Sequence, residues 1–250
     1  MIKVAVCGAN GKMGKEVCDA VEKYASMELT AKIDLYGENV YKSIAEAKKN
    51  TAFDVLVDFT QPESIFENAI YCLQNGINVV IGTTGLTDLQ IEELKALSTK
   101  NNIGCLIAPN FSTGAVLLMM FAAKAAKYFD NAEIVELHHN QKKDAPSGTA
   151  IKTALMMSQA KSSFKNGNCP EKETIEGSRG GTSYSDIQIH SVRLPGYVAS
   201  QEVLFGSDGQ VFKIRHDTTD RKCYMQGVLM SIKHVFDNKN FVYGLENILK

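Results

Sequence analysis

The feature that most constrains the fold is the alternation of short apolar runs with amphipathic helical segments through residues 2–110. Strand patterns are expected at residues 2–8, 29–34, 54–60, 77–84 and 103–110, and helical patterns at 12–26, 62–76 and 87–101. Pro62 suits a first helical turn, and Thr87 or Asp88 suits an N-cap. Helices of this length between strands imply right-handed crossovers, so we expect a doubly wound α/β domain with a mainly parallel sheet.

The loop after the first strand is rich in glycine and runs from Gly8 to Gly14 as Gly-Ala-Asn-Gly-Lys-Met-Gly. Glycine lets a pyrophosphate approach backbone N–H groups, and the N-terminus of the following helix adds partial positive charge. The spacing is G-x-x-G-x-x-G rather than the commoner G-x-G-x-x-G. Asp34, 20 residues after Gly14 at the end of the second strand, suits an acid that binds the ribose hydroxyls. A Rossmann-type dinucleotide site is therefore favoured over a turn that serves packing alone.

The identity of the dinucleotide depends on the residues around Asp34. A carboxylate there repels a 2′-phosphate, and Leu35 stands where an arginine often accommodates that phosphate. Lys12 and Lys42 could still offer a cation. NADH is therefore favoured, with NADPH tolerated.

Small and hydroxylated residues follow the later strands of this domain. In an open parallel sheet, ligands lie beyond the carboxyl ends of the strands, so these loops are expected to share one site. The complete set of expected cofactor-binding residues is Gly8, Asn10, Gly11, Lys12, Met13, Gly14, Asp34, Phe59, Thr60, Gly82, Thr83, Thr84, Ala108, Asn110 and Phe111.

The second half changes character after a long apolar helix at 113–129. Segments rich in β-forming residues follow at 132–139, 185–194, 201–206 and 210–216, with a hairpin turn expected at 207–209. This predicts an α+β domain with an open mixed sheet, whose exposed edges favour burial against other subunits. The expected domains are 1–109, with 222–250 packing back on it, and 110–221.

The stretch ELHHNQKKDAPSGTA, residues 136–150, gathers protonatable and anion-binding groups. Neighbouring residues of a strand point to opposite faces, so His138 and His139 cannot serve one site in the same way unless the strand ends there. His138 is favoured as the functional histidine because Lys142 and an anion-binding turn follow it.

That turn is Pro146-Ser147-Gly148-Thr149, which opens a helix at 150–160. Its N–H groups and two hydroxyls converge, as in sites that bind a carboxylate or phosphate. Lys142 adds a full charge, while Lys143 is expected to face solvent. A proton donor at neutral pH needs a pKa near that pH, where histidine starts and lysine does not. His138 is therefore favoured as the acid, with Lys142 as the alternative.

Composition limits the partners. A net charge of −1 gives no reason to expect nucleic acid, and no apolar run reaches the roughly 18–20 residues that span a bilayer. The chain starts directly in a strand pattern, with no signal segment. The cysteines lack C-x-x-C or zinc spacing and are expected to be buried in a reducing, cytoplasmic environment, with no metal site: they are residues 7, 18, 72, 105, 169 and 223.

The motif at 136–150 matches every fixed position of E-[LI]-H-H-x-x-K-x-D-A-P-S-G-T-A, the signature of 4-hydroxy-tetrahydrodipicolinate reductases, also called dihydrodipicolinate reductases. VAVCGANGKMG, VIGTTG and APNFS resemble that family's nucleotide and sheet-edge loops, and VRLPGYVASQEVLFG and HDTTDRKCYMQGV resemble its later segments. Where the family usually has Gly-Glu-His-Thr-Val, this chain has Ala-Ser-Gln-Glu-Val at 199–203.

The resemblance implies reduction of a small dicarboxylate with NADH or NADPH in diaminopimelate and lysine biosynthesis, by a cytoplasmic homotetramer. The layout of the two domains further predicts that they close over the substrate, hinged near Asn110 and Arg221. The roles it implies are proton transfer by His138 and Lys142, substrate contact by His139, Ser147, Gly148 and Thr149, and proximity to nicotinamide for Gly82, Thr83 and Thr84. A different amino-acid dehydrogenase, or a sensor that binds NADH without turnover, would have no need for the motif at 136–150.

Overall fold

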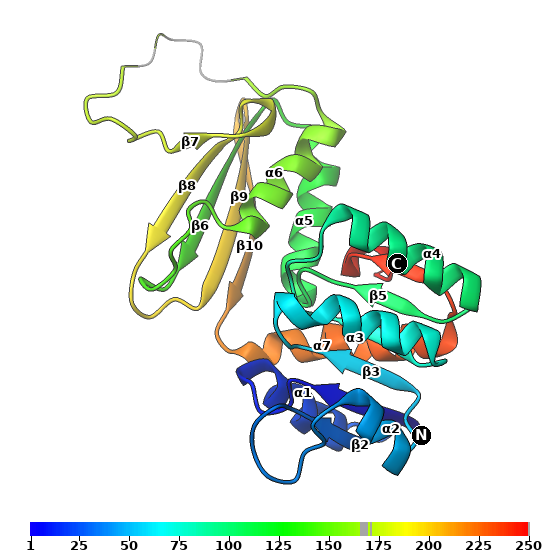
Figure 1. Cartoon of the computed structure of the whole chain (residues 1–250). Helices are drawn as coiled ribbons and strands as arrows, with labels where there is room; N and C mark the ends of the chain where they lie inside the picture. Colours follow the sequence, from blue (N-terminus) through cyan, green and yellow to red (C-terminus); the bar gives the residue numbers. More distant parts are fainter. Residues whose placement is uncertain (166–169, 171, 250) are drawn as a thin grey trace. The chain divides into compact units, whose positions relative to one another are not determined.

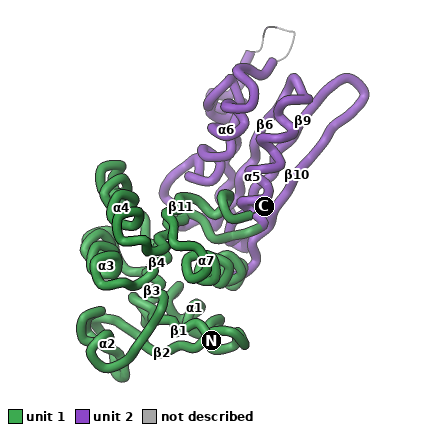
Figure 2. Tube along the Cα trace, turned by 90° about the vertical axis from the view of Figure 1, so that its right-hand side faces the viewer, with its two compact units in different colours: residues 1–113, 221–250 green, residues 114–220 purple. Residues whose placement is uncertain are grey.

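A computed structural model of the chain describes residues 1–165, 170 and 172–249. Cys169, one of the cysteines expected to be buried, lies outside the described residues. The chain divides into unit 1, residues 1–113 with 221–250, and unit 2, residues 114–220 (Figure 2).

Unit 1 is built on a six-stranded parallel sheet, as the strand and helix alternation predicts. Its order is β2 (Met27–Ile33), β1 (Ile2–Cys7), β3 (Val55–Asp58), β4 (Asn78–Ile81), β5 (Cys105–Ile107) and β11 (Phe241–Tyr243). Strands β3, β4 and β5 are buried along their whole length, which is typical of a parallel sheet covered on both faces. The expected doubly wound Rossmann-type fold is confirmed.

Helices cover both faces of this sheet (Figure 1). Helices α3 (Pro62–Gln74) and α4 (Asp88–Asn101) contact each other on one side, and α1 (Lys12–Lys23) and α7 (Met225–Asp237) contact each other on the other, as Figure 2 shows. Helix α7 lies in the segment 222–250 and is preceded by a 3₁₀ turn at Arg221–Tyr224. A further 3₁₀ turn, Leu245–Asn247, follows β11.

The helix starts follow the local signals in the sequence. Pro62 is the first residue of α3. Thr87 caps α4 in a reciprocal pair, because its Oγ1 accepts from the Gln90 amide at 3.3 Å while the Gln90 side chain accepts from the Thr87 amide at 2.9 Å. The short helix α2 (Ile44–Asn50) was not expected from periodicity, yet Ser43 caps it by accepting from the Glu46 amide at 3.1 Å. The Ser-x-x-Glu pattern was therefore the available signal for α2.

Unit 2 holds a mixed five-stranded sheet in the order β10 (Gln210–Thr218), β9 (Ala199–Ser207), β6 (Asn131–His138), β8 (Gln188–Arg193) and β7 (Gly181–Thr182). Only β6 and β8 pair in parallel among these strands. Helices α5 (Thr113–Ala126) and α6 (Gly148–Ala160) share one hydrophobic core with the sheet, and a 3₁₀ turn at Tyr184–Asp186 precedes β8. The expected open mixed sheet is confirmed, as is the β9–β10 hairpin, where Gly209 has φ of 78°.

The cysteines follow the expected burial with one exception. Cys7, Cys18, Cys72 and Cys105 are buried, but Cys223 is only half-buried. Burial raises the pKa of the Cys18 thiol to about 11, so it stays protonated at neutral pH. Cys223 lies in the 3₁₀ turn before α7 rather than on the inner face of an element, which explains the difference.

Candidate active site

The carboxyl edge of the unit 1 sheet gathers every residue expected to bind the cofactor. Residues 8–14 follow β1, Asp34 follows β2, residues 59–60 follow β3, residues 82–84 follow β4 and residues 108–111 follow β5. The strands are parallel, so these loops emerge from the same edge of the sheet. The chain order reverses between β1 and β3, and this switch point is where doubly wound sheets bind ligands.

The conformation of the turn after β1 requires glycine at positions 8 and 14. Gly8 has φ of 79°, and the Gly11 amide donates to the Gly8 carbonyl at 3.0 Å. A Cβ at Gly14 would lie 2.0 Å from that carbonyl oxygen. Gly11 is also the N-cap of α1 and has no side chain, so the amides of the first turn are left for a ligand. This tight turn beside a helix N-terminus fits a pyrophosphate.

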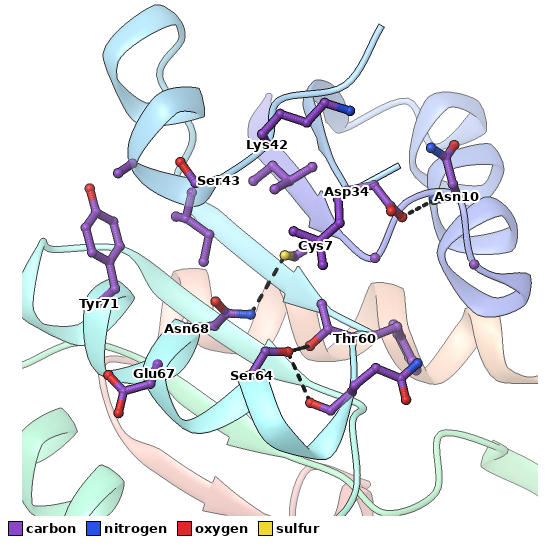
Figure 3. Close-up of a pocket in the computed structure, with 18 of the residues that line it drawn as sticks. Cys7, Asn10, Asp34, Lys42, Ser43, Thr60, Ser64, Glu67, Asn68 and Tyr71 are labelled. Carbon is purple, nitrogen blue, oxygen red and sulfur yellow. Dashed lines mark hydrogen bonds between the residues drawn. The ribbon is translucent and has the colours of Figure 1, made fainter. Parts of the chain in front are cut away.

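Asp34 links this turn to the loop after β2 (Figure 3). One carboxylate oxygen accepts from the Asn10 amide at 2.9 Å and the other from the Tyr36 amide at 3.1 Å. The neighbouring Leu35 is 73% exposed. The Lys42 ammonium donates to the Gly37 carbonyl at 2.9 Å in the same loop. The carboxylate is thus held by two backbone amides in the lining of a cavity.

The cavity has a volume of about 820 Å³ and lies entirely in unit 1. Of the expected cofactor residues, it is lined by Gly8, Asn10, Gly11, Asp34, Phe59 and Thr60, and not by Lys12, Met13, Gly14, Gly82, Thr83, Thr84, Ala108, Asn110 or Phe111. Sequence reasoning missed the wall made by α2 and α3, which includes Ser43, Ile44, Ser64, Asn68, Ile70, Tyr71 and Gln74 (Figure 3). Those α3 residues recur at helical spacing, but their mixture of polar and apolar types matches no motif.

The loops after β3, β4 and β5 meet around Phe59. The ring centroids of Phe59 and Phe111 are 5.7 Å apart, and a Cβ at Gly82 would lie 2.2 Å from the Phe59 ring. Aromatic packing therefore brings together three loops that lie apart in the sequence, including two that do not line the cavity.

Beneath these loops, the fully buried Asp58 carboxylate accepts four hydrogen bonds. Its donors are the Thr60 amide at 3.0 Å, the Thr60 hydroxyl at 2.7 Å, the Thr83 hydroxyl at 2.8 Å and the Asn68 side-chain amide at 2.9 Å. A hydroxyl has one hydrogen to donate, so Thr60 and Thr83 can act toward a ligand only as acceptors.

In unit 2, β6 ends at His138, and His139 lies in the loop that follows. The opposite-face argument for the two histidines therefore stops at His138. His138 Nδ1 lies 2.5 Å from a carboxylate oxygen of Glu136, whereas the exposed His139 accepts from the Gln141 amide at 3.2 Å through its own Nδ1. The two adjacent histidines have different environments, and only His138 is held by a charged partner.

Glu136 is a site residue that sequence reasoning did not select. It is fully buried and accepts two hydrogen bonds from Arg193, at 2.6 and 3.0 Å, and one from the Ser147 amide at 3.2 Å. Burial alone would raise the pKa of this carboxyl, but hydrogen bonds from His138, Arg193 and Ser191 lower it to about 2. The available signal was strand alternation, which places Glu136 and His138 on one face.

The loop between β6 and α6 carries the remaining predicted residues. The Lys142 ammonium donates to both carboxylate oxygens of Asp144 at 2.8 Å, and these bonds lower the pKa of Asp144. Ser147 is the N-cap of α6, and its hydroxyl accepts from the Ala150 amide at 3.2 Å. Gly148 and Thr149 form the first turn of α6, and Lys143 is exposed, as expected. This end of unit 2 combines a histidine, a cation and a helix N-terminus.

The depressed pKa of Glu136 predicts a pH-dependent stability. Its pKa is about 2 in the folded state and 4.5 ordinarily, so this contribution is complete above about pH 4.5 and is lost as pH falls toward 2. Because glutamine does not ionise, the Glu136→Gln variant lacks this contribution at every pH. We therefore expect the difference in free energy of unfolding between wild type and variant, measured with urea, to shrink steadily from pH 5 to pH 2. A difference that stays constant over this range would contradict the assigned interaction.

Over residues 1–165, 170 and 172–249, no three His, Cys, Asp or Glu side chains gather closely enough to hold a metal ion. No helix in the described part of the chain is long and apolar enough to cross a membrane.

Comparisons with known proteins agree with the geometry. Residues 2–111 match the family model "Dihydrodipicolinate reductase, N-terminus", and residues 114–249 match "Dihydrodipicolinate reductase, C-terminus". The chain is 47% identical to the 4-hydroxy-tetrahydrodipicolinate reductase of Gloeothece citriformis (strain PCC 7424), over 99% of this chain and 98% of the relative. It is 49% identical to the reductase of the same name from Streptococcus suis (strain 05ZYH33), over 99% of both chains.

Among solved structures, the chain is similar to a dihydrodipicolinate reductase from Paenisporosarcina sp. TG-14 with dipicolinate bound. That similarity has a TM-score of 0.93, with 46% identity over 100% of both chains. Both family models, the curated relatives and the solved structure lead to one conclusion. The chain belongs to the dihydrodipicolinate reductase family of NAD(P)H-dependent oxidoreductases.

Proposed function

We propose that this chain reduces 4-hydroxy-tetrahydrodipicolinate, or its dehydrated form dihydrodipicolinate, to tetrahydrodipicolinate with NAD(P)H in diaminopimelate and lysine biosynthesis. The observation that carries the proposal is the full-length similarity to a reductase with dipicolinate bound, at 46% identity. Dipicolinate is a planar ring with two carboxylates and therefore resembles the proposed substrate. The glycine turn, the cavity of unit 1 and the basic end of unit 2 supply the chemistry that such a reaction needs.

Unit 1 is the proposed cofactor-binding domain. Its glycine turn accepts the pyrophosphate at the N-terminus of α1, and Asp34 binds the adenosine ribose hydroxyls. The Asp34 carboxylate is held by the amides of Asn10 and Tyr36 in the cavity lining, where it would repel a 2′-phosphate. This supports NADH as the favoured cofactor, with NADPH tolerated through nearby Lys42.

Leu35→Arg is expected to strengthen NADPH binding by about tenfold, because a charge-assisted bond to the 2′-phosphate is worth about 1.4 kcal/mol. Leu35 is 73% exposed beside Asp34, so the longer side chain fits. The measurement is the NADPH dissociation constant by fluorescence titration. Leu89→Arg, at an 85% exposed position on α4, is the matched control and should have no effect. An unchanged NADPH affinity in Leu35→Arg would refute the proposed placement of Asp34.

Unit 2 is the proposed substrate-binding domain. The Ser147 hydroxyl and the amides of Gly148 and Thr149 bind one substrate carboxylate at the N-terminus of α6, with His139 beside them. Lys142 exchanges the Asp144 carboxylate for the second anionic group, because both are bound through the same ammonium hydrogens. With substrate bound, Lys142 pairs with the dianion. Without substrate, Lys142 pairs with Asp144, so the cation is not left unpaired.

Reduced nicotinamide, when bound, supplies hydride to the conjugated C=C–C=N unit of the substrate. His138 then donates a proton to the electron-rich enamine, at the carbon that must be protonated for the product imine to form. Its ring is fixed through Nδ1, so Nε2 carries the transferred proton. Lys142 forms an ion pair with Asp144, which suits the holding of an anion better than proton delivery.

Assembly, closure and location extend the proposal. A homotetramer would cover the outer face of the unit 2 sheet, where Val211 on β10 is 68% exposed. Closure over the substrate would hinge near Asn110 and Arg221, close to the unit boundaries at 113 and 221. A cytoplasmic location is part of this proposal.

The decisive experiment supplies enzymatically generated substrate with NADH or NADPH and follows absorbance at the nicotinamide band. Substrate-dependent oxidation of both NADH and NADPH is expected. At low cofactor concentration, the oxidation of NADH should be faster than that of NADPH. If folded protein oxidises neither cofactor while still binding NADH, the enzyme proposal is wrong and the protein is a sensor.

A further inference from the structure

We propose that Glu136 is a positioning residue that holds His138 through Nδ1 and so makes Nε2 the proton-transferring atom. The same carboxylate ties this histidine to the N-terminus of α6. This inference rests on the proposed role of His138 as the acid and adds a residue that acts through it.

The geometry of the sheet builds this cluster. Glu136 and His138 are two residues apart on β6 and therefore share one face. On β8, Ser191 is paired with Glu136 and Arg193 with His138. Cross-strand partners share a face, so Arg193 lies beside both residues. The cluster is thus formed by strand register and not by a flexible loop.

Both carboxylate oxygens of Glu136 accept hydrogen bonds. Oε1 accepts from the Arg193 guanidinium at 2.6 Å and from the Ser147 amide at 3.2 Å, and Oε2 accepts from His138 at 2.5 Å and from Arg193 at 3.0 Å. An ionised carboxylate can only accept, so His138 Nδ1 must carry the hydrogen. A flip of the imidazole would lose this bond to a fully buried charge, which holds the ring in one orientation.

The chemical consequence concerns the protonated form of His138. With Nδ1 committed, Nε2 is the ring nitrogen left for substrate, and the Glu136 carboxylate stabilises the imidazolium that must donate. The charged group that contacts the His138 ring is Glu136 on β6, which Arg193 on β8 also binds, while β9 places Ala199 opposite. In the following loop, Lys142 and Asp144 pair with each other. The positive charge of Arg193 offsets part of the negative charge of Glu136, so the stabilisation of the imidazolium by this carboxylate is partial.

A second glutamate on β6, Glu133, offers a matched control for this arrangement. Glu133, three residues earlier on β6, also binds a histidine and an arginine, with His190 at 2.8 Å and Arg179 at 2.6 Å. Its side chain is 35% exposed, and it has no bond to His138 among the described contacts. Glu133→Gln therefore removes the same type of carboxylate from the same strand, outside the proposed site.

The test compares Glu136→Gln with Glu133→Gln in the full chain. Glu136→Gln is expected to lower kcat by roughly 10- to 100-fold, part of the contribution of a general acid, while the NADH dissociation constant stays unchanged. The dependence of kcat on pH should change as well, because the imidazole ring loses its charged partner. Glu133→Gln should change neither. Equal losses in both variants with an unmoved pH profile would mean a structural role and would overturn the proposal.

A second measurement separates this proposal from the proposed function. Long-range ¹H–¹⁵N spectra of histidine-labelled protein, with His138 assigned through His138→Gln, report its tautomer without any turnover. We expect a neutral ring protonated at Nδ1 in wild type. An Nε2-protonated neutral ring would overturn the role of Glu136 even in an active enzyme.

If Glu136→Gln does not fold because Arg193 is left unpaired, the double variant Glu136→Gln/Arg193→Met removes both charges together. The same kcat loss is expected in it, because His138 Nδ1 again has no carboxylate partner. A folded double variant with wild-type kcat would overturn the proposal.

Discussion

Replacing His138 by glutamine is expected to lower kcat by about 100- to 1,000-fold, which is within the usual contribution of a general acid. Glutamine can still contact Glu136, but it cannot donate a proton at neutral pH. The NADH dissociation constant should stay within about twofold of wild type, because the cavity and the glycine turn belong to unit 1 whereas His138 belongs to unit 2. Steady-state kinetics and a fluorescence titration measure the two quantities.

His190→Gln is the matched control for this experiment. His190 is also a partly exposed histidine on the unit 2 sheet with a glutamate partner, Glu133, at 2.8 Å. It should keep kcat within about twofold, since removing it deletes no proposed proton donor. If His138→Gln weakened NADH binding as much as it lowered kcat, the residue would belong to the cofactor site and the assignment as acid would fail.

Gly14→Ala is the second substitution with a large expected effect. The added Cβ would lie 2.0 Å from the Gly8 carbonyl oxygen, and a backbone group cannot move aside as the end of a side chain can. Overpacking of this kind costs about 1–3 kcal/mol of unfolding free energy. Displacement of the turn also removes charge-assisted bonds to the pyrophosphate, so NADH affinity should fall roughly 100-fold, about 2.7 kcal/mol.

Gly11→Ala in the same turn is the comparison for stability. Its Cβ would lie 3.2 Å from the same carbonyl oxygen, so a shift of a few tenths of an ångström accommodates it. The free energy of unfolding measured with urea should be similar for wild type and Gly11→Ala and clearly lower for Gly14→Ala. Equal stability of Gly11→Ala and Gly14→Ala would show that the turn after β1 is more open than the structure has it.

The fold of unit 1 was predictable to a large extent because its signals are local. Apolar runs and helical periodicity located β1 to β5, α1, α3 and α4, and the cap at Thr87 was predictable from its own side chain. The edge strand β11 was missed because a three-residue run carries no periodicity. Helix α2 was missed because seven residues are too few for a clear hydrophobic face, although Ser43 marks its start.

The candidate site was predictable only where a motif is continuous in the sequence. The glycine turn and the stretch at 136–150 are such motifs, and the residues expected from them lie at the carboxyl edge of the unit 1 sheet and at the end of β6. The cavity wall on α2 and α3 was not predictable, since its residues come from two helices and match no pattern. The burial of Cys223 was overestimated for a related reason, because composition says nothing about where a residue faces.

The alternation of strands and helices, the glycine turn and the residue types proposed to bind a dianion and transfer a proton could all be recognised from local patterns along the chain. The cluster of Glu136 with His138, Arg193 and Ser147, at distances of 2.5 to 3.2 Å, could be recognised only in the folded chain. Arg193 lies 57 positions from Glu136 along the chain. Periodicity and turn chemistry act between neighbours in sequence, whereas a buried charge is stabilised by whichever donors the strand register brings to it.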